Sequence, residues 1–591
     1  MLSPLATLLM AAPAAPVLPL PQDELLTVWI AEGTQLLSHS KDRALARALA
    51  MIDDRILELP GEFPEAQFPP QMVPFLVGLL TDSKTFRIST DESGGPVPVR
   101  AQFDWNQHTP EEAQQLASGL MAFLTGMGAP IPEADEAGWT LLPLPLPMPL
   151  GFGPRGSSMS MSLGAPFPDG GDLSTPDLPE GVTPHLLMRV DVGAMVDMGL
   201  EALPMFDPKA AEVAETVVSM LGLDELSISA ACGADEHRGY SVARLPGFGA
   251  AMQSRGLMSE KGLSAASLRM VPVDAHFANI GQVNLQGILD LLLAIVDEPL
   301  TANGVEDPIE MLAEMTGVHL ENDLIAHLGQ TIGMYTSDTT GGGGIASTVL
   351  FMEVTNSAGL RGLIEQLIGL ANGIAMAEAE GYVQVRPWGH NGTQYWSLTF
   401  PGIPVPVEPT VVLTDNMLFV CATPGAAVAA VTQAAGNGPS LLDNEGFRAQ
   451  LPANPEGSYN VVFLDTPRFL SAGYGLVSMG TSALVNGTRS RTDDSRDAGI
   501  VMPLYHELAA GALPIVGVDT IEDGDLVSRS HTDASLLVNI TGISGYYLSN
   551  PAMFLPAALL LAGAGVREQQ MATMQAYEIE EASKPVPVED Y

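Results

Sequence analysis

Residues of the kind that bind metal ions gather in one short segment. His319, Glu321, Asp323 and His327 lie within nine residues, and imidazole and carboxylate groups are ligands of zinc. On an α-helix, both histidines and Asp323 would follow one another at four-residue spacing and share a face. The neighbouring row of that helix is made of leucines, so the pattern also fits the exposed, acidic edge of a packed helix. We expect that second arrangement and predict no metal site.

Two acidic turns carry carboxylates that could bind calcium, which prefers oxygen ligands. They are Asp493–Asp497 and Glu522–Asp525. The second stands between two strand-like runs, a position typical of a hairpin turn. We therefore predict neither a metal ion nor another cofactor, although calcium stays the alternative at both turns.

Signals for nucleophilic or phosphate chemistry are weak. Ser38 and Lys41 match the S-x-x-K pattern without the other elements of a penicillin-binding site, and no G-x-S-x-G is present. Gly341–Gly344 lacks the Lys and the following helix of a phosphate-binding loop, and precedes a strand-like run. The sequence thus indicates no catalytic residue. It leaves open a site whose side chains converge only in the fold.

The chain has two cysteines, Cys232 and Cys421, each inside an apolar strand-like run. No C-x-x-C motif occurs, so neither a metal–thiolate nor a redox motif is supported. We expect two buried free thiols. One long-range disulfide is the alternative.

The composition is that of a large, very acidic folded protein. The 591 residues exceed a single core and predict three to five packed units. Hydrophobic residues make up 46%, which argues against global disorder. With 69 acidic and 25 basic residues the net charge is −44, which argues against binding nucleic acid or anionic membrane surfaces.

Both ends of the chain carry distinctive segments. Residues 1–21 are uncharged and rich in Leu and Ala, and Ala12–Ala14 offers an A-x-A cleavage site, so we expect a signal-like leader and export. Residues 546–576 predict an apolar helix, and 577–591 an acidic tail. The apolar core of that helix, 552–566, is shorter than the roughly 20 residues of a membrane span. We expect it to pack on the protein, with a C-terminal anchor as the alternative.

A strand followed by a capped helix occurs three times. In each copy the first apolar helical residue lies four positions after the cap, as on one face of a helix. The copies are Val99–Trp105 with cap Thr109, Thr348–Val354 with cap Asn356, and Met417–Ala422 with cap Thr423.

A longer pattern of strand, helix, strand and strand also occurs three times. The copies begin at His185–Val192, Ala275–Gly281 and Tyr459–Asp465, and end at Tyr240–Leu245, Ala346–Glu353 and Leu526–His531. We predict an α+β fold of repeated strand–helix–strand–strand units, with mainly antiparallel sheets and helices packed on one face. The expected units are 22–165 (N-terminal), 183–260 (second), 270–440 (central) and 455–545 (C-terminal).

Part of the sequence resembles a known group of proteins. Gly317–Gly329 ends in a Leu-Gly pair before the strand-like Gln330–Tyr335, and Phe419–Pro424 is a strand that ends in Thr-Pro. Over about 275–540, these features resemble large exported bacterial proteins catalogued only as a domain of unknown function. Gln330 stands where an acidic residue would be expected in that family. The resemblance implies a fold and export, and no reaction.

These observations favour an exported, non-enzymatic binding or surface-assembly protein. Its partner would be a ligand or a component of the cell envelope, and repeated sheet–helix units could enclose an apolar groove for a lipid-like ligand. Membrane contact would run through the C-terminal apolar helix. The alternative is an exported hydrolase whose site is assembled only in three dimensions.

Overall fold

The architecture is an α+β fold built on one very wide sheet. A computed structural model describes residues 24–550 with gaps, of which the longest are 59–80, 168–177, 294–312 and 489–501. The expected leader, the apolar segment 552–566 and the acidic tail lie outside the described residues. Within the described part, 19 strands form a single sheet in which every neighbouring pair is antiparallel. This confirms the predicted α+β class and the predominance of antiparallel pairing.

The strands divide into two sets along the chain. The N-terminal set is β1 (Glu24–Ile30), β2 (Ser83–Thr90), β3 (Val99–Asn106), β4 (Thr140–Leu142), β5 (Leu150–Arg155), β6 (Ser158–Leu163), β7 (Thr183–Asp191), β8 (Ser227–Ala234) and β9 (Arg238–Leu245). The C-terminal set is β10 (Ala275–Gln282), β11 (Leu328–Ser337), β12 (Val349–Val354), β13 (Gln384–His390), β14 (Thr393–Thr399), β15 (Thr410–Leu413), β16 (Met417–Cys421), β17 (Asn460–Leu464), β18 (Ile515–Glu522) and β19 (Asp525–Asp533).

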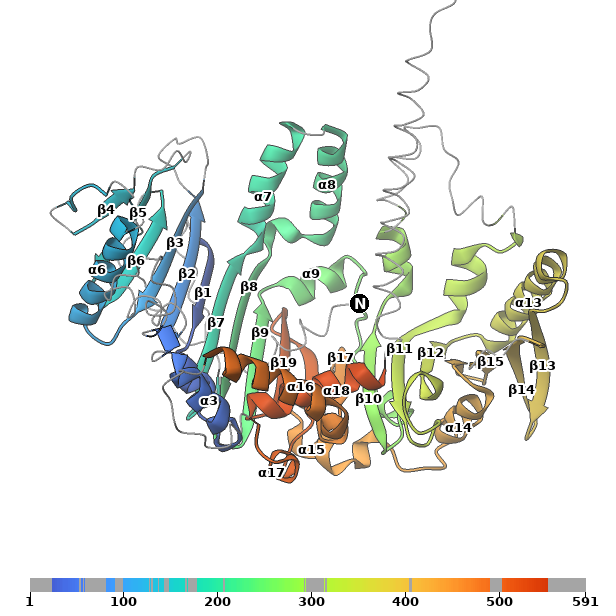
Figure 1. Ribbon diagram of the computed structural model, residues 1–591. Helices are drawn as coiled ribbons and strands as arrows, with labels where there is room; N and C mark the ends of the chain where they lie inside the picture. The colour runs from blue at the N-terminus through green and yellow to red at the C-terminus, as the bar shows by residue number, and fades with distance from the viewer. Residues whose placement is uncertain are drawn as a thin grey trace, which may run out of the picture.

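The order of the strands across the sheet keeps these two sets apart. The N-terminal set runs β4-β5-β6-β3-β2-β1-β7-β8-β9. The sheet continues with β19-β18-β17-β10-β11-β12-β16-β15-β14-β13. The two sets therefore join at β9 and β19. The ribbon passes from blue and cyan strands at one end to yellow strands at the other (Figure 1).

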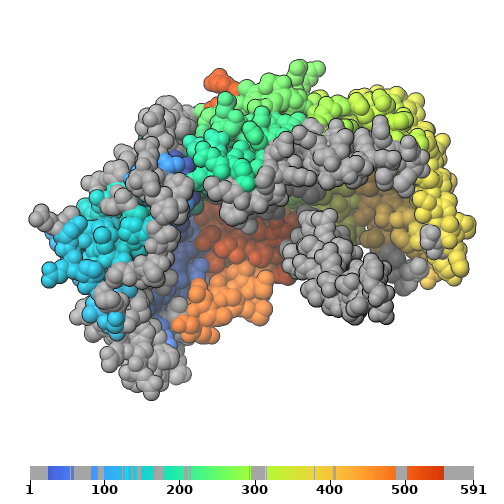
Figure 2. Space-filling model, turned by 90° about the horizontal axis from the view of Figure 1, so that it is seen from above, coloured from blue at the N-terminus to red at the C-terminus, as the bar shows by residue number. Residues whose placement is uncertain are grey.

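The helices have the following bounds. They are α2 (Gly33–Leu36), α3 (Arg43–Ala50), α6 (Pro110–Gly126), α7 (Val192–Ala202), α8 (Pro208–Leu221), α9 (Phe248–Ser254), α10 (Ala265–Leu268), α13 (Ser357–Ala379), α14 (Pro424–Ala434), α15 (Glu445–Gln450), α16 (Thr466–Thr488), α17 (Tyr505–Ala509) and α18 (Leu536–Ser549). Helices α7 and α8 project from the sheet side by side (Figure 1). Seen from above, the molecule is hollowed between its cyan and yellow ends (Figure 2).

All three predicted helix caps are present. The Thr109 hydroxyl accepts a hydrogen bond from the Glu112 amide at 3.3 Å, and the Glu112 carboxylate accepts one from the Thr109 amide at 3.0 Å. Asn356 caps α13, and Thr423 caps α14. Each side chain satisfies an amide that the first helical turn leaves without a partner, which explains why these residues begin helices.

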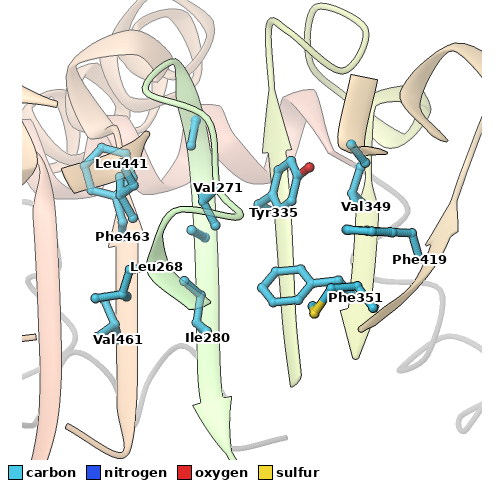
Figure 3. Close-up of a cluster of buried hydrophobic side chains, with 14 of the residues drawn as sticks. Leu268, Val271, Ile280, Tyr335, Val349, Phe351, Phe419, Leu441, Val461 and Phe463 are labelled. Atoms are coloured by element: carbon cyan, nitrogen blue, oxygen red, sulfur yellow. The ribbon is translucent and has the colours of Figure 1, made fainter. Parts of the chain in front are cut away.

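The central core lies under the middle strands of the C-terminal set. Tyr335, Phe351, Phe419 and Phe463 are each at most 1% exposed, and they pack with Ile280 in one cluster (Figure 3). The rings of Phe351 and Phe419 are 6.4 Å apart, and those of Tyr335 and Phe351 6.1 Å. Burial of these side chains, each contributing roughly 1.5–3 kcal/mol, holds the five neighbouring strands β17, β10, β11, β12 and β16 to α14 and α15.

The junction between the two strand sets is polar. Arg244 on β9 forms an ion pair with Asp525 at 3.1 Å, and Arg529 on β19 forms one with Glu522. The turn between β18 and β19 is Asp523-Gly524, with φ of 53° and 94°. The hairpin predicted at Glu522–Asp525 is thus confirmed, and these two carboxylates contact arginines.

We also predict that the stability of the protein depends on pH through His531, which lies at this junction. His531 stacks edge-on against Tyr240 with ring centroids 4.9 Å apart, and burial lowers the pKa of His531 to about 4. The unfolded chain takes up this proton near pH 6.5. The stability contributed by neutral His531 is therefore present above about pH 6.5 and is lost as the pH falls towards about 4. Between about pH 7 and pH 4.5, wild type should lose roughly 2 kcal/mol more than His531→Phe in urea unfolding. Parallel losses in the two proteins would contradict this.

Candidate functional surface and a buried histidine

Helix α16 is long and almost free of charge. It begins with Thr466 and Pro467, and proline suits the first helical turn because its missing N–H has no partner there. After Arg468, no Asp, Glu, Lys, Arg or His occurs in the helix up to Thr488. A charge-free stretch of this length stands out in a chain of net charge −44.

Glycines let α16 and α18 cross at very short range. A Cβ on Gly473 would lie 1.9 Å from the carbonyl oxygen of Thr541, and a Cβ on Gly545 1.9 Å from that of Phe469. Any side chain at these positions would push the backbones apart. The crossing is antiparallel, so the end of α18 lies beside the start of α16.

A second contact ties this helix pair to the N-terminal part of the chain. The Asp42 carboxylate accepts hydrogen bonds from the Ser535 hydroxyl at 2.7 Å and from the amides of Leu536 and Leu537 at 2.9 and 3.0 Å. Burial raises the pKa of Asp42, and these hydrogen bonds oppose the rise. Leu45 and Ala48 of α3 pack in the same cluster as residues of α16 and α18. A residue distant in sequence therefore caps α18.

The opposite side of α16 is exposed and apolar. Leu476 is 48% exposed, Met479 67% and Leu484 43%. We call the exposed residues of the helix from 471 to 487 the α16 face: Ser471, Ala472, Gly475, Leu476, Met479, Gly480, Ser482, Ala483, Leu484, Asn486 and Gly487. Residues 472, 476, 479, 483 and 486 follow four- and three-residue steps, the spacing by which one helix presents a continuous seam. No partner within the described residues covers it.

Helix α13 carries a shorter surface of the same kind. Its exposed residues between Gln366 and Ala377 are uncharged, and Ile374 and Met376 are 56% and 60% exposed. Arg361 and Glu365 stand earlier in this helix, so its charge-free stretch is shorter than that of α16.

A cluster of titratable groups lies where α16 begins. His276 on β10 is 2% exposed, and its Nε2 lies 3.2 Å from a carboxylate oxygen of Asp338, which also pairs with Arg468. A Cβ on Gly343 would come within 3.2 Å of the imidazole, so the glycine turn closes over the ring. Gly341 to Gly344 all have positive φ, a conformation that favours glycine.

The surroundings of His276, Asp338 and Asp465 shift their pKa values, and the two carboxyl groups shift in opposite directions. Burial lowers the pKa of His276, which keeps the imidazole neutral, and the nearby Arg468 acts in the same direction. Partial burial opposes ionisation of Asp338, but hydrogen bonds and charge from Arg468 lower its pKa overall. Burial raises the pKa of Asp465, next to the start of α16. A lowered and a raised carboxyl pKa in one cluster is an arrangement that acid–base catalysis uses.

The predicted metal-like segment has a different geometry from the one expected. Residues Leu320–Leu324 form one π-helical turn and Ile325–His327 a 3₁₀ turn, so the expected four-residue row of His319, Asp323 and His327 on an α-helix is wrong. The Asp323 carboxylate accepts a hydrogen bond from the amide of His319, while the His327 ring lies 3.3 Å from the side-chain amide of Asn356. Within the described residues, no group of three His, Cys, Asp or Glu side chains is placed to hold a metal ion.

The other residues singled out from the sequence do not converge either. The Nζ atom of Lys41 lies 4.0 Å from a carboxylate oxygen of Asp533, with which it forms an ion pair. Cys232 and Cys421 are free thiols, and burial raises their pKa to about 11 and about 12. Asp493–Asp497 lies outside the described residues. The cluster around His276 was missed because its members come from three distant strand ends.

Comparisons with known proteins add little to this geometry. No family model matches the chain, and no curated protein matches it. One solved structure, described as "Structure of crystal form I of TP0453", aligns with 47% of this chain and 97% of its own, at 7% identity and a TM-score of 0.19. A similarity of that size carries no argument about fold or function. Among the described helices, none combines the length and the apolar character that crossing a bilayer requires.

Proposed function

We propose that this is an exported, non-enzymatic binding protein whose α16 face holds an apolar partner. The observation that carries the proposal is the exposure of Leu476, Met479 and Leu484 on a helix with no charged residue between 469 and 488. Exposed apolar patches framed by polar surface mark binding sites more often than chance would place them. Export rests on the uncharged run at 1–21 and on the resemblance to exported proteins.

We further propose that the two strand sets are repeats of one larger unit. Chain order and sheet order correspond strand by strand: β1 with β10, β2 with β11, β3 with β12, β4 to β6 with β14 to β16, and β7 to β9 with β17 to β19. Each of the three expected strand–helix–strand–strand units falls within this scheme. The strand β13 is an addition at one edge. Such a duplication would give the molecule two related ends around a central helix pair.

A neutral apolar fluorophore tests the binding proposal. N-phenyl-1-naphthylamine should bind to the wild type, and Met479→Glu should weaken its binding at least about tenfold, because a carboxylate at the centre of the α16 face opposes burial of an apolar ring. Thr432→Glu adds the same charge to an exposed position of α14 and should leave binding unchanged. Equal binding by all three proteins, with matched unfolding transitions, would contradict the proposal.

The alternative function is hydrolysis, and the His276 cluster is the observation that favours it. His276, Asp338 and Asp465 combine a neutral imidazole with carboxyls of opposite pKa shift. The imidazole is buried beneath the glycine turn, which favours a structural role at the start of α16. An esterase activity of the wild type that is lost in His276→Gln at unchanged stability would support the alternative.

A further inference from the structure

We infer that the partner of the α16 face is the acyl chain of a single lipid molecule whose headgroup carries no net charge. This inference rests on the proposed function and specifies its ligand. It rests on the charge of the chain, on the alternation of long side chains and glycines along the face, and on the hollow that Figure 2 shows beside this part of the chain.

The net charge of the chain favours an uncharged partner over an anionic or a basic one. The chain has a net charge of −44, so an anionic lipid, an acidic protein or a second copy of this chain meets long-range repulsion on approach. A basic partner would be attracted, but the α16 face offers no carboxylate with which to pair it. An uncharged, apolar partner avoids both penalties.

The alternation of long side chains and glycines on the α16 face suits a thin and flexible acyl chain. Around Gly475, Gly480 and Gly487, a Cβ would meet nothing within 4 Å. These glycines lie beside Leu476, Met479 and Leu484 in the helix, so long side chains alternate with positions that have no side chain. Methionine adapts its shape to irregular apolar surfaces. The 17 residues from 471 to 487 span about 24 Å, more than the roughly 15 Å of one leaflet's acyl chains.

The position of this part of the chain favours a single molecule over a bilayer surface. Figure 2 shows that orange to red residues, the part of the chain to which α16 and α18 belong, line the hollow between the cyan and yellow ends. A flat bilayer would meet the projecting ends first. A lipid that leaves the bilayer can enter such a hollow and cover the α16 face.

Lipid transfer from vesicles tests the inference. Full-length protein is incubated with phosphatidylcholine vesicles or with phosphatidylglycerol vesicles, separated from them by flotation, and assayed for bound phospholipid. We expect about one phosphatidylcholine per protein, at least tenfold less phosphatidylglycerol, and a loss of at least tenfold in Met479→Glu but not in Thr432→Glu.

Three outcomes would overturn the inference. The protein could float with the vesicles without carrying lipid away, which would indicate a bilayer contact. Both lipids could be retained equally, which would remove the charge argument. Wild type could bind N-phenyl-1-naphthylamine through the α16 face and retain no lipid, which would leave the proposed function standing without this ligand. Absence of both fluorophore and lipid binding would reject the proposed function itself.

Discussion

Replacing Asp42 with alanine is expected to lower the free energy of unfolding by about 3 kcal/mol. The carboxylate accepts three hydrogen bonds at the start of α18, two of them from backbone amides that have no helical partner. Its side chain is fully buried, so water cannot replace it without rearrangement. Loss of a helix cap costs about 1–2 kcal/mol, and a hydrogen bond to a charged group about 1.5–3 kcal/mol.

Urea unfolding of Asp42→Ala beside Glu111→Ala measures this effect. Glu111 lies exposed in the first turn of α6, so its replacement removes the same charge without removing a buried acceptor. The control should change stability by less than about 0.5 kcal/mol. If both variants unfold at the same urea concentration, Asp42 does not hold α18 as described.

Alanine at two glycines of α16 is expected to act in opposite directions. Gly473→Ala places a methyl group 1.9 Å from the Thr541 carbonyl oxygen, so α16 and α18 must separate, at a cost of about 3 kcal/mol. Gly475→Ala meets nothing within 4 Å, and alanine in a helix interior is favoured over glycine by roughly 0.5–1 kcal/mol.

The comparison is well matched because both substitutions are the same and lie two residues apart on one helix. Thermal and urea unfolding of the two variants should bracket the wild type. Destabilisation of both by the same amount would mean that α16 tolerates no alanine for reasons unrelated to the crossing. Stabilisation by Gly473→Ala would contradict the close approach of α16 and α18.

Local features of the fold were predictable from the sequence because they depend on neighbouring residues. Thr109, Asn356 and Thr423 were recognised as helix caps, and the turn at Asp523-Gly524 as a hairpin, from patterns no longer than a few residues. Strand ends differed from the prediction by at most three residues, and boundaries are the least certain part of an element.

The wide sheet and the candidate sites were not predictable in the same way. The pairing of β9 with β19 joins segments that are far apart in the sequence, and neither strand's sequence indicates which strand it pairs with. The helical row of His319, Asp323 and His327 failed because a π-helical turn followed by a 3₁₀ turn breaks the four-residue spacing. The charge-free run of α16 was visible in the sequence. Its exposure depends on α18 and α3 covering only the other side.

Photolabelling tests the central claim, that the α16 face is the binding surface, most directly. Wild type is incubated with phosphatidylcholine that carries a diazirine in its acyl chain, irradiated, digested and mapped by mass spectrometry. We predict that adducts concentrate between residues 471 and 487, with Met479 among the labelled positions, and that Met479→Glu loses them. Adducts spread evenly over the exposed helices, or concentrated on α13 and absent from α16, would contradict the account.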